Sequence, residues 1–570
     1  MKNSSIISAF VGLLVLLADC EATAQWSTSP DSNTAVCTAP VLQFLPSVVG
    51  DGTGGAIVTW YDLRNDPMFG DIYAQRVDAY GFAQWTIDGV GICLGVFQLQ
   101  DDNGRPRIVG DGTGGAIITW ADFRNGWASV YAQRVSASGD PLWATNGVRI
   151  RPSPNRQYTP FIMSDGRGGA IVAFEENPGS SYDIYVQRID SAGNLRWGSN
   201  AVTVASGVGP QPSLTMTSDG DDGAIIAWED YRNTYGDIYA QRVNALGSVQ
   251  WTTNGAAVCS APGGQATPEI VADGMGGAVI AWLDGRNGPL QIFAQRIDSS
   301  GVVQWATDGV ALCNMPSDQE FHSIATDGNS GAIIGWADFR QGLENLDIYA
   351  QRIDASGRLR WDSSGVTVCL AGSNQANTKL VSSGSGRAIV IWGDIRSGHD
   401  EIYAQLIDSS GNVQWTTNGV AISTVSSVKI DHCITSGLGG GGIIAWTDGR
   451  NGEVDADIYI QQIGGNGILG SVTTSVNENG RRILPFGLRQ NFPNPFNPWT
   501  TIRYNLSSAG HVTLRVYDVL GREVARLVDE DKAAGTWSVV LNGENLSSGV
   551  YFYRLTTGTY AETRKLVLLK

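Results

Sequence analysis

Aspartate and arginine recur two residues apart along most of the chain, and they are its most regular candidates for chemistry. The pattern is Trp-x-Asp-x-Arg, as in Trp282 to Arg286. In a β-strand, residues i and i+2 point to the same side, so each pair can form an ion pair. The pairs are Asp62/Arg64, Asp122/Arg124, Asp230/Arg232, Asp284/Arg286, Asp338/Arg340, Asp394/Arg396 and Asp448/Arg450. Such regularity favours a structural clamp.

The same pairs could instead form a ring of charges that binds a polyanionic or polyhydroxylated ligand. The third repeat carries Glu176 and Pro178 in place of the pair, so we expect any ring to be interrupted there. A second acidic series comprises Asp71, Asp183, Asp237, Asp347, Asp457 and Glu401. Together the two series could supply the six to eight oxygens that Ca²⁺ takes, but no EF-hand or nonapeptide spacing is present. We favour turn capping and assign no metal ligand.

Catalytic motifs are absent from the sequence. His322, His399, His432 and His511 occupy unrelated repeat positions, and there is no His-x-x-x-His or Cys-x-x-Cys pair. No nucleophile elbow occurs, and Gly437–Gly442 is a hairpin turn rather than a phosphate loop. We therefore assign no catalytic and no cofactor-binding residue. Trp127 lies outside the repeat pattern; it is either packed in its loop or able to stack on a sugar.

The elements that position these residues follow from two tryptophan series. The steps between neighbours in the first series are 60, 54, 54, 54, 54, 56 and 54 residues, which indicates a repeat architecture. The first series is Trp60, Trp120, Phe174, Trp228, Trp282, Trp336, Trp392 and Trp446, and the second is Trp26, Trp85, Trp143, Trp197, Trp251, Trp305, Trp361 and Trp415.

Each repeat opens with Gln-Trp and holds four short runs rich in Val, Ile, Tyr and Trp, separated by Gly, Asn, Asp and Ser. Such runs are typical of antiparallel strands. Four strands repeated eight times predict an all-β protein with an eight-bladed β-propeller over residues 25–463. A β-solenoid is the competing fold. The last repeat lacks its Gln-Trp run, so we predict that residues 25–37 complete the blade of Trp446 and close the ring.

The net charge and the N-terminal segment indicate which partners to exclude and where the protein is located. The 570 residues carry a formal net charge of −17, which disfavours a nucleic-acid partner. Residues 1–24 predict a signal peptide cleaved between Ala24 and Gln25, because an apolar run too short to span a bilayer precedes Ala22-Thr23-Ala24. A lipoprotein signal at Cys20 is the less favoured alternative. We predict no transmembrane segment and expect secretion or outer-membrane surface exposure, as a monomer.

Six cysteines remain after the signal peptide: Cys37, Cys93, Cys259, Cys313, Cys369 and Cys433. The first five end the same segment in different repeats, where the other repeats carry Arg151, Ala205 and Ser423. Equivalent positions in successive repeats lie too far apart for the roughly 5.5 Å Cα spacing of a disulfide. We therefore predict small, buried, free cysteines.

The repeats give way to a linker at 464–487 and a different domain at 488–570. Alternating runs such as Val512–Asp518 and Gly549–Leu555 predict six or seven strands in an immunoglobulin-like sandwich. Its motifs are Asn491–Pro498, Val516-Tyr517-Asp518 with Gly521-Arg522-Glu523, Leu546–Tyr553 and Thr563-Arg564-Lys565. In these motifs the domain resembles the C-terminal sorting domain of the type IX (Por) secretion system and the related flagellar-hook-capping-type Ig-like domain. The resemblance implies translocation across the outer membrane by that machinery, followed by removal of the domain or surface attachment.

We therefore expect an exported, non-catalytic binding or adhesion module that recognises a glycan or a surface protein. The alternative is an extracellular carbohydrate-active hydrolase or lyase with its site at the propeller mouth. Binding is favoured because an enzyme needs residues that break the symmetry of the repeats, whereas the candidates here either repeat or are scattered.

Overall fold

We describe a computed structural model of the chain. It describes residues 26–570, apart from 68, 99–103, 180, 208, 471–486, 489–490, 492–493, 507–508, 534 and 559. The predicted cleavage site, Ala24 and Gln25, lies outside the described residues. The chain divides into two compact units, Gln25–Thr473 and a second that includes Thr474–Lys570, and each is described by itself.

The first unit contains eight four-stranded antiparallel sheets, which we number as blades 1 to 8. Blades 1 to 4 are β2 (Gln43–Gly50), β3 (Ala56–Asp62), β4 (Asp71–Val77), β5 (Val90–Cys93); β6 (Arg107–Gly110), β7 (Ala116–Asp122), β8 (Ser129–Val135), β9 (Val148–Arg149); β10 (Arg156–Ser164), β11 (Ala170–Asn177), β12 (Asp183–Ile189), β13 (Val202–Ala205); β14 (Thr215–Ser218), β15 (Ala224–Asp230), β16 (Asp237–Val243), β17 (Ala256–Cys259). Blades 5 to 8 are β18 (Gln265–Ala272), β19 (Ala278–Asp284), β20 (Gln291–Ile297), β21 (Val310–Ala311); β22 (Gln319–Thr326), β23 (Ala332–Asp338), β24 (Asp347–Ile353), β25 (Val366–Cys369); β26 (Gln375–Gly384), β27 (Arg387–Asp394), β28 (Glu401–Ile407), β29 (Val420–Ser423); β30 (Lys429–Ser436), β31 (Gly442–Asp448), β32 (Asp457–Ile463), β1 (Thr34–Cys37).

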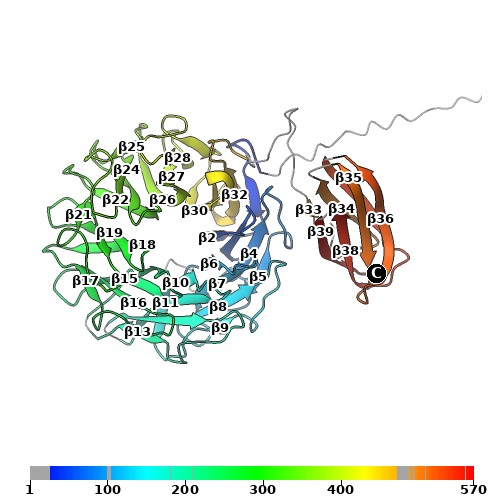
Figure 1. Cartoon of the computed structure of the whole chain (residues 1–570), viewed down its shortest axis with the longest axis horizontal. Coiled ribbons are helices and arrows are strands. Elements are labelled where there is room, and N and C mark those ends of the chain that lie inside the picture. The colour runs from blue at the N-terminus through cyan, green and yellow to red at the C-terminus, as the bar shows by residue number, and fades with distance from the viewer. Residues whose placement is uncertain are drawn as a thin grey trace, which may run out of the picture. The chain divides into compact units, whose positions relative to one another are not determined.

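These sheets form a closed ring. The first strand of each blade contacts the first strand of the next, from β2 round to β30, and β30 contacts β2 (Figure 1). The predicted β-propeller is therefore confirmed. Two 3₁₀ turns, η1 (Leu438–Gly440) and η2 (Glu453–Asp455), are the helical elements of the described residues. None of the helices described in this chain has the length and apolarity needed to span a membrane.

Burial on both faces explains the apolar character of the second strand in each blade. In β19 six of the seven residues are buried. Trp282 is fully buried and stacks on Phe293 with ring centroids 6.4 Å apart. The second tryptophan joins neighbouring blades, since the indole nitrogen of Trp251 donates to the Ser299 carbonyl oxygen over 3.1 Å. The flat rings therefore fill the space between facing sheets, as expected for large aromatic residues.

The N-terminal segment closes the ring. β1 pairs antiparallel with β32 and supplies the fourth strand of blade 8, which confirms the predicted closure. Trp26 is buried and donates from its indole nitrogen to the Ala79 carbonyl oxygen of blade 1 over 2.9 Å. The repeat boundary differs from the one read in the sequence. The Gln-Trp run makes only an isolated bridge, as between Ile297 and Val303, and the cysteine-bearing run after it is the outer strand of the preceding blade.

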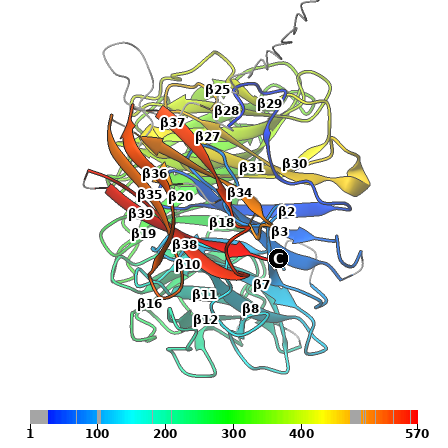
Figure 2. The same cartoon turned by 90° about the vertical axis from the view of Figure 1, so that its right-hand side faces the viewer.

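The C-terminal unit has two sheets, ordered β33-β34-β37 and β36-β35-β38-β39. Its strands are β33 (Gly487–Leu488), β34 (Trp499–Leu506), β35 (Gly510–Tyr517), β36 (Glu523–Lys532), β37 (Gly535–Asn542), β38 (Gly549–Thr557) and β39 (Tyr560–Leu568), drawn in orange to red in Figures 1 and 2. Ile502, Leu514 and Tyr553 are fully buried in one core shared by both sheets. The strands predicted here are therefore present, and alternate residues of β38 are buried, as their alternating sequence requires.

Removal of residues 26–37 should open the ring, because blade 8 then loses a strand and β32 exposes an unpaired edge. We expect the truncated protein to unfold at a lower urea concentration than the protein beginning at residue 25, and a synthetic peptide of residues 26–37 to restore the midpoint. A scrambled peptide is the control. Equal midpoints for the truncated and the longer protein would show that the segment does not close the ring.

Candidate binding face of the propeller

One end of the ring carries the loops that could form a site. The loops between the second and third strands, and those from each outer strand to the next blade, emerge at this end, which we call the loop face. The opposite end carries short turns such as 273–277 between β18 and β19. The predicted Asp–Arg pairs lie at the end of the second strand and thus on the loop face.

The Asp–Arg pairs are structural clamps. In blade 5, Asp284 accepts from the Trp282 indole over 2.9 Å and from Arg286 Nε over 2.7 Å. The guanidinium of Arg286 lies 4.2 Å from the Phe293 ring centroid, and its Nη2 also donates to Cys259 Sγ of blade 4 over 3.1 Å. Asp284 is 1% exposed. The pair therefore holds its own blade together and ties it to the preceding one, and its charges are used within the fold.

Five of the six cysteines belong to the same clamp. Cys259 is free and buried, and burial raises the pKa of its thiol to about 12. Arginine donates to the sulfur in five blades, at Cys37, Cys93, Cys259, Cys313 and Cys369. The predicted free cysteines are confirmed; Cys433 is half-buried, and the other five are buried.

Blade 3 restores the clamp from a different residue. Glu176 takes the aspartate position and Pro178 the arginine position, and Arg151 stands where other blades carry cysteine. Arg151 reaches across with its Nη1 2.5 Å from Glu176 Oε2 and its guanidinium 3.6 Å from the Tyr185 ring centroid. The expected interruption of the ring of charges was therefore wrong, because the guanidinium has moved from one strand to the neighbouring blade.

A second clamp, on the face opposite the loops, was missed by the sequence analysis. Arg134 binds Asp111 over 2.9 Å, and its Nη1 donates over 3.0 Å to the Ser191 carbonyl oxygen, which also accepts from Trp143. Equivalent pairs occur in six blades: Asp51/Arg76, Asp111/Arg134, Asp165/Arg188, Asp219/Arg242, Asp273/Arg296 and Asp327/Arg352. The available signal was the joint recurrence of the Asp-Gly turn and the Gln-Arg run in the same repeats.

In the second acidic series, Asp71 and Asp183 cap loops by accepting from a backbone N–H. Asp71 accepts from the Gly95 backbone over 2.6 Å and from the Asn65 amide over 2.8 Å. In blade 6, Gln341 replaces that asparagine, and both oxygens of the 1%-exposed Asp347 lack a hydrogen-bond partner. Burial, with a further contribution from Asp338, raises the pKa of Asp347 to about 6. Across the described ranges no group of three or more His, Cys, Asp or Glu could hold a metal ion.

A rim of variable residues surrounds the loop-face mouth. In seven blades the residue after the clamp aspartate donates its backbone N–H to the residue just before the first-strand Gln or Lys. The pairs are Leu63/Leu42, Phe123/Phe97, Tyr231/Pro210, Gly285/Gly264, Phe339/Asp318, Ile395/Asn374 and Gly449/Val428. This backbone hydrogen bond is the same in all seven blades, whereas the pair of side chains differs from blade to blade. The scaffold therefore presents a different surface on each blade.

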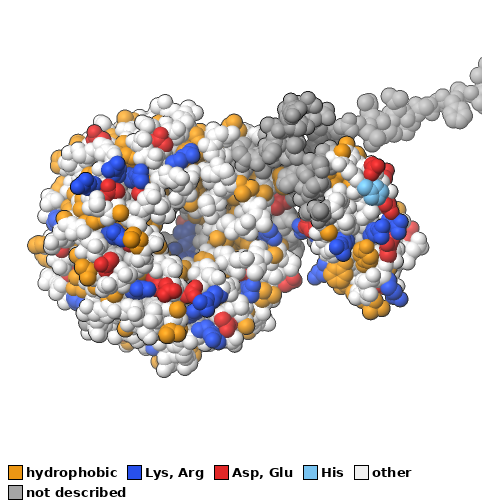
Figure 3. All heavy atoms as spheres, in the orientation of Figure 1, with side chains coloured by type: hydrophobic (Ala, Val, Ile, Leu, Met, Phe, Trp, Pro, Cys, Tyr) orange, Lys and Arg blue, Asp and Glu red, His pale blue; other side chains and the backbone are white. Residues whose placement is uncertain are grey.

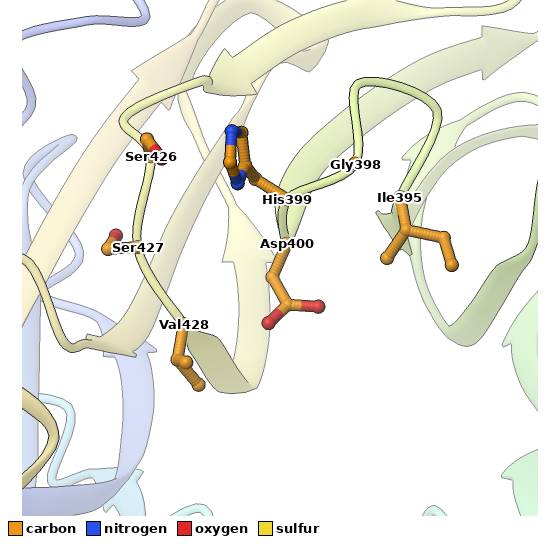
Figure 4. Close-up of a pocket in the computed structure, with 7 residues that line it drawn as sticks. All are labelled: Ile395, Gly398, His399, Asp400, Ser426, Ser427 and Val428. Atoms are coloured by element: carbon orange, nitrogen blue, oxygen red, sulfur yellow. The ribbon is translucent and has the colours of Figure 1, made fainter.

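Among the described residues, two pockets lie between blades on this face. The first, of about 500 Å³, is lined by Pro289, Ser317, Phe339 and Leu343, among others, between blades 5 and 6. The second, of about 400 Å³, lies between blades 7 and 8 and is shown in Figure 4.

The pocket between blades 7 and 8 contains His399, Asp400 and two serines, but these do not assemble into a triad. The His399 ring and the Asp400 carboxylate point in different directions (Figure 4). Ser427 Oγ donates to the clamp residue Asp448 over 2.8 Å. Lys429, buried behind the pocket, donates to the Asp400 carbonyl oxygen over 2.8 Å, and burial lowers its pKa. In the described structure no hydrogen bond joins His399 to a serine or a carboxylate.

The other histidines lie elsewhere. His322 and His432 are buried on the first strands of blades 6 and 8; burial lowers the pKa of both, that of His432 to about 4. His511 lies in the C-terminal unit beside Asp529 and Asp531, which raise its pKa. Trp127 is half-buried, and its indole donates to the Ser153 carbonyl oxygen over 3.0 Å. His322, His399 and His432 thus lie on three different blades of the propeller.

The centre of the ring is hollow, with Lys and Arg side chains visible inside it (Figure 3). Arg105, just before β6, donates to the Pro46 carbonyl oxygen of blade 1 over 3.0 Å. The Arg107 guanidinium lies 3.8 Å from the Phe161 ring centroid of blade 3. These two arginines join the inner strands of neighbouring blades, so their cationic groups too have a structural role.

Comparison with known proteins adds one decisive match. Residues 490–569 match the family described as secretion system C-terminal sorting domain. This sorting domain indicates export from the cell, followed by secretion or attachment to the cell surface, and interaction with the type IX secretion machinery. No curated protein matches the chain.

Several solved structures resemble the chain at low identity. An α-L-arabinanase of Penicillium chrysogenum is 11% identical with a TM-score of 0.34, covering 65% of this chain and 96% of its own. An exo-β-1,3-galactanase of Phanerochaete chrysosporium is 13% identical with a TM-score of 0.27, covering 82% and 96%. An acylaminoacyl peptidase of Pyrococcus horikoshii is 10% identical with a TM-score of 0.36, covering 73% and 59%. At these TM-scores the likeness carries no argument about activity.

Arg151→Cys should leave Glu176 buried without its guanidinium and lower the free energy of unfolding by about 3–5 kcal/mol, as removal of one partner of a buried pair does. Adding Pro178→Arg to that variant recreates the arrangement of the other blades and should recover most of the loss. Urea unfolding of the single and double variants measures both effects. A double variant as unstable as Arg151→Cys would contradict the inference that Arg151 replaces the clamp arginine that is missing at Pro178.

Asp347→Asn should stabilise the protein at pH 8 by about 1 kcal/mol. The pKa of Asp347 is raised from 3.8 to about 6 in the folded protein. The protonated carboxyl is tolerated in the folded protein, and the ionised carboxylate destabilises it. The folded protein therefore has its full stability below pH 4 and loses part of it as the pH rises through 6. The gain from Asn should vanish by pH 4 in thermal unfolding. Asp71→Asn, which removes a hydrogen-bonded carboxylate, should give no gain; a pH-independent difference for Asp347→Asn would refute the assignment.

Proposed function

We propose that this exported protein is a non-catalytic binding module whose ligand sits on the loop face of the propeller. The propeller spans residues 25–463, the linker 464–487 and the sorting domain 488–570. The signal peptide, residues 1–24, directs Sec export before the C-terminal domain engages the type IX machinery. The ligand is a glycan or a surface protein, and the protein acts as a monomer.

The separation of constant from variable residues carries this proposal. The acids and arginines that repeat are buried in clamps between strands and blades, whereas the rim pairs differ from blade to blade. A rigid scaffold that presents variable loop residues is a common arrangement for recognition. Function is therefore expected at the rim rather than in the repeated charges.

The alternative, a carbohydrate-active hydrolase or lyase, needs an acid and a base or nucleophile held within hydrogen-bond reach. The pocket between blades 7 and 8 brings a histidine, an aspartate and two serines to one place and is therefore the candidate for such a group. Within the described residues, however, Ser427 is held by Asp448 and His399 has no acidic partner. This arrangement supports binding over turnover.

The mature protein beginning at residue 25 should retain glycans on an array or protein from cell-surface extracts, and release no product from them. Binding is measured with and without Ca²⁺ as a control for metal dependence. Retained glycans are then incubated with the protein at catalytic and stoichiometric amounts and examined for new reducing ends or unsaturated products.

Product release that increases with time and protein would move the protein to the enzyme class. His399→Ala is the matched variant for that outcome. If the pocket between blades 7 and 8 is not catalytic, this variant should bind and release product to the same extent as the wild type. Loss of product release in His399→Ala would identify that pocket as the active site.

A further inference from the structure

We infer that the loop face of blades 1 to 4 is a binding surface for a neutral polysaccharide, built from aromatic side chains on four consecutive blades. The inference rests on the proposed function and names the ligand class and the residues for it. We call this surface the aromatic arc; it comprises Phe69, Phe97, Phe123, Trp127, Tyr158, Tyr182, Tyr231 and Tyr235.

Four of the eight arc residues are exposed although they are aromatic, and the other four are half-buried. Phe69 is 43% exposed, Phe97 44%, Tyr231 40% and Tyr235 62%. Among the propeller residues with described exposure, one other aromatic side chain, Phe321 on the first strand of blade 6, is exposed to a similar degree. Exposed aromatic residues gathered on one face usually mark a site of interaction.

The exposed rings are held in place by their neighbours. Phe97 stacks on Phe123 with centroids 4.9 Å apart, and Phe69 meets Phe97 edge to face at 5.3 Å. The hydroxyl of Tyr231 donates to Glu229, a contact that raises the tyrosine pKa to about 12. Because their positions are fixed before binding, these rings lose little conformational entropy when a ligand stacks on them.

The arc occupies one half of the ring. Phe69, Trp127 and Tyr235 each lie two residues before the third strand of their blades, and Tyr182 lies one residue before it. The residues two positions before the third strand in blades 5 to 8 are Pro289, Asn345, His399 and Asp455 instead. At the positions just before the third strand, the repeat thus places a Phe, Tyr or Trp on four successive blades and none on the following four, although Phe339 of blade 6 matches Phe123 in position. An extended ligand that touches several blades matches this distribution, because linked weak contacts add in avidity.

Charge selects a neutral ligand. The guanidiniums beneath the arc, Arg64, Arg124, Arg151 and Arg232, are each bound to a buried Asp or Glu of the clamp. The described loops of these blades therefore offer no cluster of free cations for an anionic polymer, and the net charge of −17 repels one. A neutral sugar chain presents apolar C–H faces to the rings and hydroxyls to the tyrosine hydroxyls. It therefore fits a surface that is aromatic and has no cluster of free cations.

The test is affinity electrophoresis of the mature protein in gels that contain xylan, β-1,3-glucan or galactomannan, with polygalacturonate as the anionic comparison. We expect one or more neutral polysaccharides to retard the protein and polygalacturonate not to do so. Phe97→Ala and Tyr235→Ala should each weaken retention about tenfold, and their combination should weaken it further. Leu343→Ala, on the loop face of blade 6, is the matched control and should bind as the wild type.

Thermal unfolding of each variant establishes that it is folded. Retardation by no neutral polysaccharide, or arc variants that bind like the wild type, would overturn the arc. The proposed function would still stand if the protein bound a surface protein or an anionic glycan without turnover, and would fall if product were released. The two proposals therefore fail by different observations.

Discussion

The structure depends on the clamp between a buried carboxylate and a guanidinium that also reaches the neighbouring blade. A propeller sheet is covered on both faces, so a blade has no stable fold without its neighbours. In blade 5 the carboxylate of Asp284 receives bonds from Trp282 and Arg286, and Arg286 reaches the sulfur of blade 4. Each clamp places charged groups where desolvation is costly, so each must keep its partner.

That constraint divides the residues into two sets. Repeated acids, arginines and tryptophans are committed to holding blades together, and so they cannot readily vary or serve a ligand. The loop-face rim keeps only a backbone bond and is free to carry Phe97 in blade 2, Gly264 in blade 5 or Asn374 in blade 7. Recognition in a repeat protein of this kind is expected where the repeats differ.

The sequence was sufficient for the propeller, the closing N-terminal segment, the free cysteines and the strands of the C-terminal unit, because period and alternation are local signals. It was insufficient where a residue acts across blades. Arg151 was read as a missing cysteine and Pro178 as a broken clamp, and only the pairing of strands shows that one compensates for the other. The aromatic arc was also missed, except for Trp127, because the rings come from loops of different lengths.

Hydrogen–deuterium exchange of the mature protein with and without a retained polysaccharide is the most direct measurement of where the ligand binds. We expect slower exchange in the loops of blades 1 to 4, around residues 63–70, 94–98, 123–128, 155–158, 178–182 and 231–236, and unchanged exchange in the loops of blades 5 to 8. Protection confined to the pockets between blades 5 and 6 or 7 and 8 would contradict it and place recognition on the other half of the ring.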